Sequence, residues 1–355
     1  MKKLLLASTA LVMSAGVAAA DVSLSGDARM GLVYNGDDVE FNSRARVTFT
    51  LSGETSTGLA FGGSFRADQA TGATTGELGS VFISGEFGRL SMGDVDGAAL
   101  AAVGDLYFGS LTGLGDRNEM IYINRAVGDE ENPFNAALDG IVFGGFKNLP
   151  RALYEYSFDG FSVFVSIDNP DVVRAVGDET VIIDDVEVPL GFASGDKRAS
   201  LRSASIGLSY TFDGFTGAIG YEEARIKNYD PDGTSETASA KHAIASLTYE
   251  FSGDFDGFAV KGIYGRAGGD LGSFLSDTQG AKRNQYGLSA MGTFDEVTVT
   301  AFGNRNFFTT DYGIGAAYDL GGGAALTGGI VRLGSNSDLG IESATTADFG
   351  LTFSF

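Results

Sequence analysis

Arginine is the residue type with the clearest chemical role in the first hundred residues. Five arginines fall on the polar side of segments in which polar and apolar residues alternate: Arg29, Arg44, Arg46, Arg66 and Arg89. Side chains two residues apart in an extended chain point the same way, so these five are expected to line one wall of an enclosed space. Guanidinium groups gathered on one wall attract anions and orient dipolar solutes. The alternative is that each arginine only solvates the wall or pairs with a nearby acid.

The segment from Val95 to Asn148 supplies the opposite charge, with eight acids against three bases. If this segment folds inward, its carboxylates face the arginines, and an electric field crosses the gap between them. The four acids expected to take this position are Asp96, Asp105, Asp116 and Glu119. The run from Asp129 to Glu131 is more typical of a solvated turn.

The sequence contains few residues or motifs that could carry out enzymatic catalysis. It has no cysteine, which excludes disulfides, zinc–thiolate sites and a cysteine nucleophile. A Ser-His-Asp arrangement would have to use the single histidine, His242, which lies at a polar strand position and is expected to belong to the wall. The 53 glycines form no phosphate-binding loop and no dinucleotide-binding fingerprint. We therefore expect no enzymatic activity and no required cofactor.

The connection Asp168–Ser200 is also acidic, with eight acids against three bases. One interpretation is a soluble external loop. The other is a Ca²⁺ site, because oxygen ligands on flexible loops suit this ion.

Alternation with a period of two runs through nearly the whole chain after residue 20. In Phe41–Leu51, for example, the odd positions are apolar apart from Ser43, and the even positions are polar. This pattern predicts strands with one apolar face, and most of them sustain it for eight to twelve residues, the length that crosses a membrane as a tilted barrel strand. We expect sixteen strands: Val22–Val33, Phe41–Leu51, Gly58–Ala67, Leu78–Glu86, Arg89–Gly93, Arg151–Phe158, Phe161–Ile167, Leu201–Phe212, Phe215–Glu223, Lys241–Phe251, Phe258–Gly265, Arg283–Phe294, Val297–Asn306, Asp311–Asp319, Ala324–Leu333 and Ala344–Phe355. The predicted fold class is all-β, a sixteen-stranded antiparallel transmembrane β-barrel.

Short turns and longer polar connections alternate along the chain, as in an up-and-down barrel. The phrase Phe-Asp-Gly-Phe occurs three times, at Phe158–Phe161, Phe212–Phe215 and Phe255–Phe258. Asp-Gly is a strong hairpin signal, and the flanking phenylalanines predict an aromatic belt at the membrane interface. Two of the longer connections are Ala224–Ala240 and Arg266–Lys282.

Residues 1–20 have the pattern of a secretory signal peptide. Lys2 and Lys3 precede an apolar stretch, and Ala18 to Ala20 provide the small residues before a cleavage site at Asp21. The rest of the chain, residues 21–355, is expected to form one barrel domain. The formal net charge of -22 argues against nucleic acid as a partner.

The sequence resembles the trimeric general diffusion porins of Gram-negative outer membranes, especially their alphaproteobacterial, Rhodobacter-type branch. The resemblance lies in the run Glu86–Asp94, in the following residues Val95–Ala99, in the late turn Tyr318–Gly323 and in the aromatic last strand ending at Phe355. It implies that residues 95–148 form a long third external loop folded into the pore. It also implies a homotrimer in the outer membrane, in contact with lipids and lipopolysaccharide, that passes ions and small hydrophilic solutes passively. Two alternatives are a substrate-selective channel, for sugars for example, and a secreted soluble β adhesin.

Overall fold

The structure is a computed structural model of the 355-residue chain. It describes residues 21–76, 78–125, 150–168, 172–176, 180–183, 186–189, 197–229 and 235–355. The predicted signal peptide and residues 126–149 of the predicted pore loop lie outside the described residues. No helix in the described part of the chain is long and apolar enough to cross a membrane.

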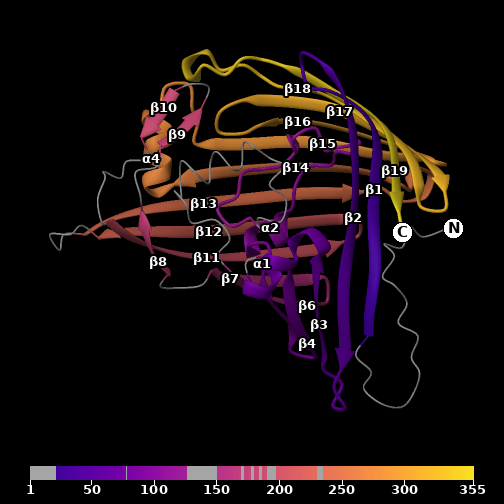
Figure 1. Ribbon diagram of the computed structural model, residues 1–355, viewed down its shortest axis with the longest axis horizontal. Helices are drawn as coiled ribbons and strands as arrows, with labels where there is room; N and C mark the ends of the chain where they lie inside the picture. The colour runs from indigo at the N-terminus through magenta and orange to yellow at the C-terminus, as the bar shows by residue number, and fades with distance from the viewer. Residues whose placement is uncertain are drawn as a thin grey trace.

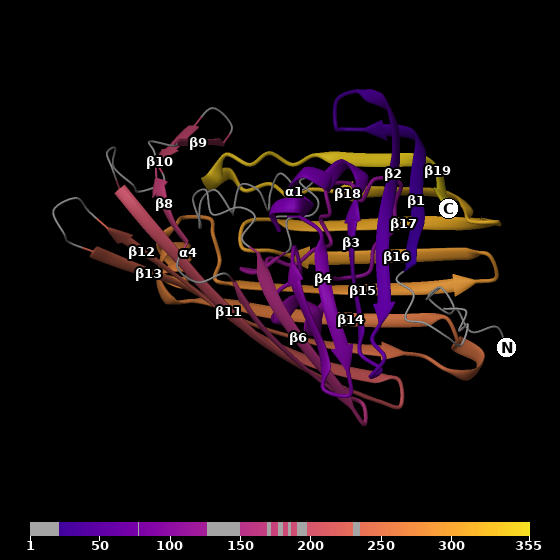
Figure 2. The same cartoon turned by 60° about the horizontal axis from the view of Figure 1, so that its bottom comes forward.

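The strands follow one another in chain order around a single wall (Figures 1 and 2). They are β1 (Asp21–Tyr34), β2 (Val39–Glu54), β3 (Ala60–Arg66), β4 (Ser80–Gly85), β5 (Gly88–Gly93), β6 (Arg151–Phe158), β7 (Phe161–Asp168), β8 (Val172–Val176), β11 (Lys197–Phe212), β12 (Phe215–Tyr229), β13 (Ser235–Glu250), β14 (Phe258–Gly268), β15 (Asn284–Phe294), β16 (Val297–Arg305), β17 (Thr310–Gly321), β18 (Ala324–Arg332) and β19 (Thr345–Ser354). Two further strands, β9 (Thr180–Ile183) and β10 (Val186–Pro189), form a separate hairpin.

The 17 strands of this sheet fill sixteen positions around the barrel, because β7 and β8 lie one after the other in a single position. β7 pairs with the second half of β11, and β8 pairs with its first half. β1 pairs with β2 on one side and with β19 on the other, so the sheet closes on itself and has no free edge. The structure is thus an antiparallel barrel of sixteen strands, and the predicted fold class is confirmed.

Exposure alternates along the strands and separates an outer from an inner face. On β14, Val260, Tyr264 and Arg266 are exposed, whereas Ala259 and Ile263 are buried. The exposed rows of the other strands are apolar over most of their length, which suits contact with lipid. The polar rows therefore face the lumen.

Two of the three Phe-Asp-Gly-Phe phrases form the predicted tight hairpins. Asp159 and Gly160 have φ angles of 46° and 80°, and Asp213 and Gly214 have 48° and 81°. Two consecutive positive φ angles define the turn that matches the twist of paired strands. The third phrase differs, since Asp256 has a φ of −57° and follows the short 3-10 helix η2 (Gly253–Phe255). It nevertheless joins the paired strands β13 and β14 with Gly257 at a φ of 94°, so the predicted hairpin is confirmed there with a different turn geometry.

Aromatic rings meet beside these turns, as the sequence predicted. The ring centroids of Phe161 and Tyr210 are 4.2 Å apart, and those of Phe215 and Tyr249 are 4.3 Å apart. Phe258 and Phe294 continue the row at 4.9 Å. The rings therefore form a belt at the level at which one membrane interface is expected.

Three strands, β11, β12 and β13, extend four residues or more beyond their predicted bounds at one end. β12 runs to Tyr229 and β13 begins at Ser235, so most of the predicted connection Ala224–Ala240 is strand. β11 likewise begins at Lys197. On β12 the outward row becomes charged at Arg225 and Lys227, which ends the apolar alternation, while the backbone pairing of β12 with β11 and β13 continues.

Candidate functional site

A segment of 31 residues, 95–125, lies inside the barrel and is here called the inner segment. It begins with the helix α2 (Ala98–Val103), whose first two residues contact the lumen side of the wall. Ala98 N donates to Ser166 Oγ on β7 at 3.0 Å, and Ala99 N donates to Ser205 Oγ on β11 at 2.7 Å. These serines stand on buried, inward positions, so the helix lies within the barrel.

The outgoing arm, residues 104–112 of the inner segment, then runs along the wall from β15 to β19. Tyr107 N donates to Ser289 Oγ on β15, and Gly109 N donates to Thr300 Oγ1 on β16, at 2.9 and 3.0 Å. Leu111 N and Thr112 N both donate to the carboxylate of Asp348 on β19. Inward side chains of the wall thus supply the acceptors that an irregular backbone lacks.

The last residues of the inner segment, 118–125, are here called the returning arm. A buried group of three polar side chains holds this arm: Glu222, His242 and Gln285. Glu222 Oε1 accepts from Ile123 N at 2.8 Å, and its Oε2 accepts from Asn124 N at 3.0 Å. Gln285 binds both the N–H and the carbonyl of Ile121.

His242 links the two anchors. Its Nε2 lies 2.8 Å from Gln285 Nε2, which can only donate, so Nε2 is the acceptor and Nδ1 carries the hydrogen. Nδ1–H then donates to Glu222 Oε1 at 2.8 Å. His242 is therefore a structural wall residue, as predicted. Sequence reasoning missed the role of Glu222, Gln285 and Asp348, although each is a polar residue at an inward position.

Glycines let the inner segment approach the wall closely. A Cβ atom added to Gly315 on β17 would lie 1.8 Å from the carbonyl oxygen of Gly109, and one added to Gly207 on β11 would lie 2.2 Å from that of Ala98. Both distances are far below van der Waals contact. Because these inward glycines have no Cβ atom, the backbone of the inner segment can contact the wall directly.

We expect Gly315→Ala to push the inner segment toward the pore axis. The added methyl group cannot fit without a shift, and overpacking of this kind costs about 1–3 kcal/mol. Single-channel conductance and thermal stability should both fall. Gly217→Ala on β12 is the matched control, because a Cβ there meets no atom within 4 Å. Equal behaviour of the two variants would contradict the close contact.

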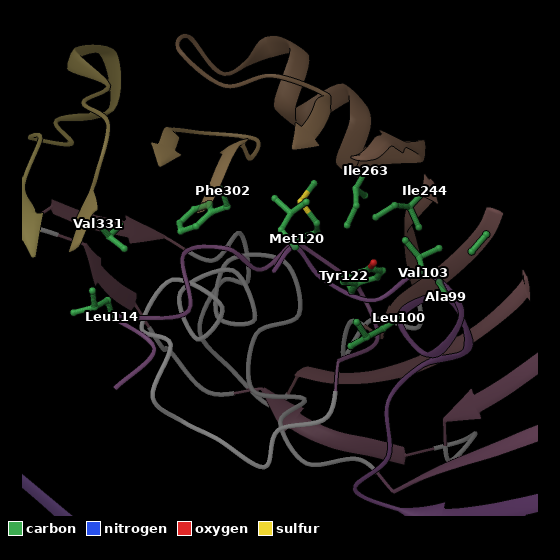
Figure 3. Packing of buried hydrophobic residues seen from close by; sticks show 12 residues of the cluster. Ala99, Leu100, Val103, Leu114, Met120, Tyr122, Ile244, Ile263, Phe302 and Val331 are labelled. Atoms are coloured by element: carbon green, nitrogen blue, oxygen red, sulfur yellow. The ribbon is translucent and has the colours of Figure 1, made fainter. Parts of the chain in front are cut away.

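An apolar cluster holds the middle of the inner segment (Figure 3). Val103, Met120 and Tyr122 pack against Ile244 on β13 and Ile263 on β14, and the same cluster extends to Phe302 on β16. This explains why some inward positions of these strands are apolar.

Four of the predicted arginines form a group on β1–β3, here called the arginine wall: Arg29, Arg44, Arg46 and Arg66. Arg29 and Arg44 are directly opposite each other in the β1–β2 register. Arg44 Nη2 lies 3.2 Å from Asp27 Oδ2, and Arg29 Nε donates to Asn42 Oδ1 at 2.9 Å. Local pairing, the alternative considered from the sequence, thus applies to part of the group.

Arg66 joins this group from β3. It is opposite Thr48 and therefore diagonal to Arg46 on β2. Its Nη2 lies 3.1 Å from Asp68 Oδ2. Asp27 and Asp68 thus supply two carboxylates to this group of four arginines.

Arg89 is separated from the other four. It pairs with Ser84 on β4, which pairs with Ala60 at the opposite end of β3 from Arg66. Its guanidinium stacks over the Phe82 ring at 3.8 Å. The expectation of a single strip of five arginines is corrected in this respect, because alternation predicts the face of a side chain and not its height along the barrel.

Three of the four predicted acids surround one arginine of their own segment. Arg125 Nη2 lies 2.9 Å from Asp105 Oδ1, and Arg125 Nη1 lies 3.3 Å from Glu119 Oε2. Burial alone would lower the pKa of Arg125, but Asp105, Glu119 and Asp96 outweigh burial and hold this pKa above its ordinary value. This group of three carboxylates and one guanidinium is here called the acidic cluster, and Lys261 on β14 interacts electrostatically with Asp105.

The fourth acid, Asp116, lies elsewhere on the segment. It is next to Arg117, whose carbonyl accepts from Asn304 Nδ2 on β16 at 2.6 Å. Burial lowers the pKa of Arg117, while Asp311 and Asp116 oppose this shift. Arg117 and Asp311 also line a cavity of about 490 Å³. Asp116 is thus not part of the acidic cluster.

Strand order places the two charged groups across the lumen from each other. Asp105 follows Val103, whose carbonyl oxygen accepts from Lys261 Nζ on β14 at 2.6 Å. The Arg44–Arg46 pair is on β2, and β14 is seven strand positions from β2 in one direction and nine in the other. In a barrel of sixteen positions, this is nearly the opposite side.

Metal binding was left open by the sequence. Among the described residues, no group of three His, Cys, Asp or Glu side chains could hold a metal ion. Most of the acidic connection Asp168–Ser200 lies outside the described residues or has undescribed side chains. Both interpretations of this connection, a soluble external loop and a Ca²⁺ site, stay predictions. The solvated turn Asp129–Glu131 also lies outside the described residues and stays a prediction.

Comparisons with known proteins agree with this architecture. A family model described as Gram-negative porin matches residues 7–339. The porin of Rhodobacter capsulatus is 35% identical over 94% of this chain and 100% of its own length. A porin structure refined at 1.8 Å has a TM-score of 0.67 at 35% identity, with the same coverage of both chains. A Rhodopseudomonas blastica porin variant, at 20% identity and a TM-score of 0.56 over 94% of this chain and 100% of its own, matches in fold.

The closed barrel and the segment inside it define a channel protein, and the chain belongs to the Gram-negative porin family. It is therefore an outer-membrane porin channel, and the resemblance seen in the sequence is confirmed. Membership in this family supports a channel rather than an enzyme.

Proposed function

We propose that the protein is a general diffusion channel that filters ions and small hydrophilic solutes between the arginine wall and the acidic cluster. The observation that carries this proposal is the anchoring of Asp105 and Arg125 by β12–β15, nearly opposite Arg44 and Arg46 on β2. A wall that carries four guanidinium groups, opposite a group that carries three carboxylates, produces a transverse field in the passage.

This field favours dipolar solutes that can rotate into it and disfavours apolar ones. The inner segment also narrows the lumen, so size adds to the filter. The preference between cations and anions depends on which charged wall lies closer to the ion path.

A substrate-selective sugar channel fits the inward aromatic residues less well. Such a channel needs exposed aromatic faces along the lumen. Phe302 is covered by the inner segment, and Phe82 is stacked under Arg89. Family membership also disfavours the soluble adhesin considered from the sequence.

A homotrimer is part of the proposal. On β1 and β2, of 14 and 16 residues, the outward rows carry no charged side chain over their whole length. The outward rows of β11 and β12, of 16 and 15 residues, include Arg202, Arg225 and Lys227. An outward face that stays apolar over the whole strand length is suited to contact with other copies of the chain. The rest of the outer surface is suited to contact with outer-membrane lipids and lipopolysaccharide. The face of β1 and β2 includes Val22, Leu24, Met30, Leu32, Phe41 and Val47.

The test is single-channel conductance of the detergent-purified protein in a planar bilayer, with the reversal potential measured in a salt gradient. We expect stable ohmic steps that close in thirds, as three pores in one trimer require. Block by a micromolar sugar would favour the selective channel. Failure of folded protein to insert would contradict the channel altogether.

A further inference from the structure

A buried ion pair at the start of β6 and the end of β7 contacts the inner segment where the segment begins. Arg151 and Asp168 are directly opposite each other in the β6–β7 register, and Arg151 Nε donates to Asp168 Oδ1. The two residues are only 8% and 4% exposed, so water does not separate the charges. Arg151 Nη1 also donates to the carbonyl oxygen of Val95 at 2.6 Å. The ion pair therefore binds the first residue of the inner segment.

The same ion pair reaches the other end of the inner segment through Ser203 on β11. Ser203 Oγ donates to Asp168 Oδ2 and also lies within hydrogen-bonding distance of Asn124 Oδ1. Ser203 and Asn124 are both buried. Gly97 N donates to the carbonyl oxygen of Asn124 at 2.8 Å, which joins the two ends of the segment directly. The side chains that hold these ends together are here called the root clamp: Arg151, Asp168 and Ser203.

The residues next to the clamped ends belong to the acidic cluster. Arg125 directly follows Asn124, and its guanidinium nitrogens lie 2.9 Å from Asp105 Oδ1 and 3.3 Å from Glu119 Oε2. Asp96, whose charge also acts on Arg125, follows the first residue that the clamp binds. A change in the position of Asn124 therefore moves a guanidinium group that compensates these carboxylates.

Asp105 itself is held by other contacts. Its Oδ1 accepts from Met120 N at 2.8 Å. Two residues earlier, the carbonyl oxygen of Val103 accepts from Lys261 Nζ on β14 at 2.6 Å. Loss of the root clamp is therefore expected to move Arg125 more than it moves Asp105. The carboxylate would then act on passing ions with less compensation by Arg125.

We propose that the root clamp positions Arg125 within the acidic cluster and thereby sets how strongly the channel discriminates between cations and anions. This inference rests on the proposed filter between the arginine wall and the acidic cluster. Arg151 and Asp168 are positioning residues, because they are buried, carry opposite charges and act on ions through Arg125.

The test is the reversal potential of Arg151→Gln/Asp168→Asn in a salt gradient, measured on the full-length, detergent-purified protein in a planar bilayer. Both partners are replaced, since one buried charge left alone would be strongly destabilising. The double substitution leaves the net charge unchanged, so a shift cannot come from total charge. We expect the cation-to-anion permeability ratio to rise about twofold, slightly less than the effect of one unit charge about 7 Å from the ion path at 0.1 M salt.

Ser203→Ala tests the root clamp without touching its charges. It removes the hydroxyl group that links Asp168 to Asn124, and the ion pair with Arg151 remains. We expect a smaller shift in the same direction, together with an unchanged circular dichroism spectrum. A permeability ratio equal to that of the wild type in both folded variants would overturn the proposal.

Glu223→Gln/Arg225→Gln is the matched control. It also removes one ion pair at unchanged net charge, with Arg225 Nε 2.7 Å from Glu223 Oε1. This pair lies on the outer face of β12, and the Arg225 side chain is 65% exposed. We expect the permeability ratio of the wild type. A shift equal to that of Arg151→Gln/Asp168→Asn would overturn the assignment to the root clamp.

Arg46→Glu separates failure of this inference from failure of the proposed filter. A shift in Arg46→Glu, with none in Arg151→Gln/Asp168→Asn, would leave the filter standing and overturn the role of the root clamp. The absence of a shift in Arg46→Glu would overturn the filter, and this inference with it.

Discussion

Glu222→Gln is expected to loosen the returning arm of the inner segment and to make single-channel currents noisy, with frequent brief closures. The Glu222 carboxylate accepts three hydrogen bonds, from Ile123 N, Asn124 N and His242 Nδ1. A glutamine has one oxygen, and its amide nitrogen would face at least one of these donors. Each donor left without an acceptor in this sealed site costs about 1–3 kcal/mol.

The barrel itself should survive this change, because its backbone pairing does not involve the Glu222 side chain. Circular dichroism of the purified protein should therefore be unchanged while the current trace changes. Glu223→Gln is a close control, since the neighbouring side chain points to the outer face. Quiet currents from Glu222→Gln would mean that Gln285, Asp348 and the apolar cluster hold the segment without the carboxylate.

Arg46→Glu is expected to shift the cation-to-anion permeability ratio toward cations by about sevenfold. The substitution changes the local charge by two units. At about 7 Å from the ion path in water at 0.1 M salt, this amounts to about 0.6 kcal/mol for each ion, with opposite signs for cations and anions. The reversal potential in a salt gradient measures the change directly.

Arg89→Glu makes the same change in charge at the other end of the strands. Because Arg89 is six residues along β3 from the level of Arg66, about 20 Å in an extended strand, its effect on the ratio should stay below about twofold. Equal shifts from the two variants would contradict the separation of Arg89 from the arginine wall. They would also mean that selectivity is set by total charge and not by the narrow part of the pore.

The strand extensions and the position of Arg89 show where a pattern in the sequence stops being informative. Alternation reports which face a side chain occupies, so Arg29 and Arg44 could be assigned to the lumen from the sequence. It ends where the outward row becomes charged, as at Arg225, although the pairing of β12 continues. Height along the barrel depends on register between strands, which no single strand encodes.

The sequence by itself determined the barrel, because period-two alternation, tight Asp-Gly turns and aromatic belts are local properties of each hairpin. It also supplied the charged side chains of both walls. Only the tertiary structure decided that Asp105 and Glu119 face Arg125, and that Glu222, Gln285 and Asp348 hold the inner segment. The contacts of Glu222, Gln285 and Asp348 with the segment join residues 98 to 237 positions apart. They form only when the closed wall brings these distant strands to the loop.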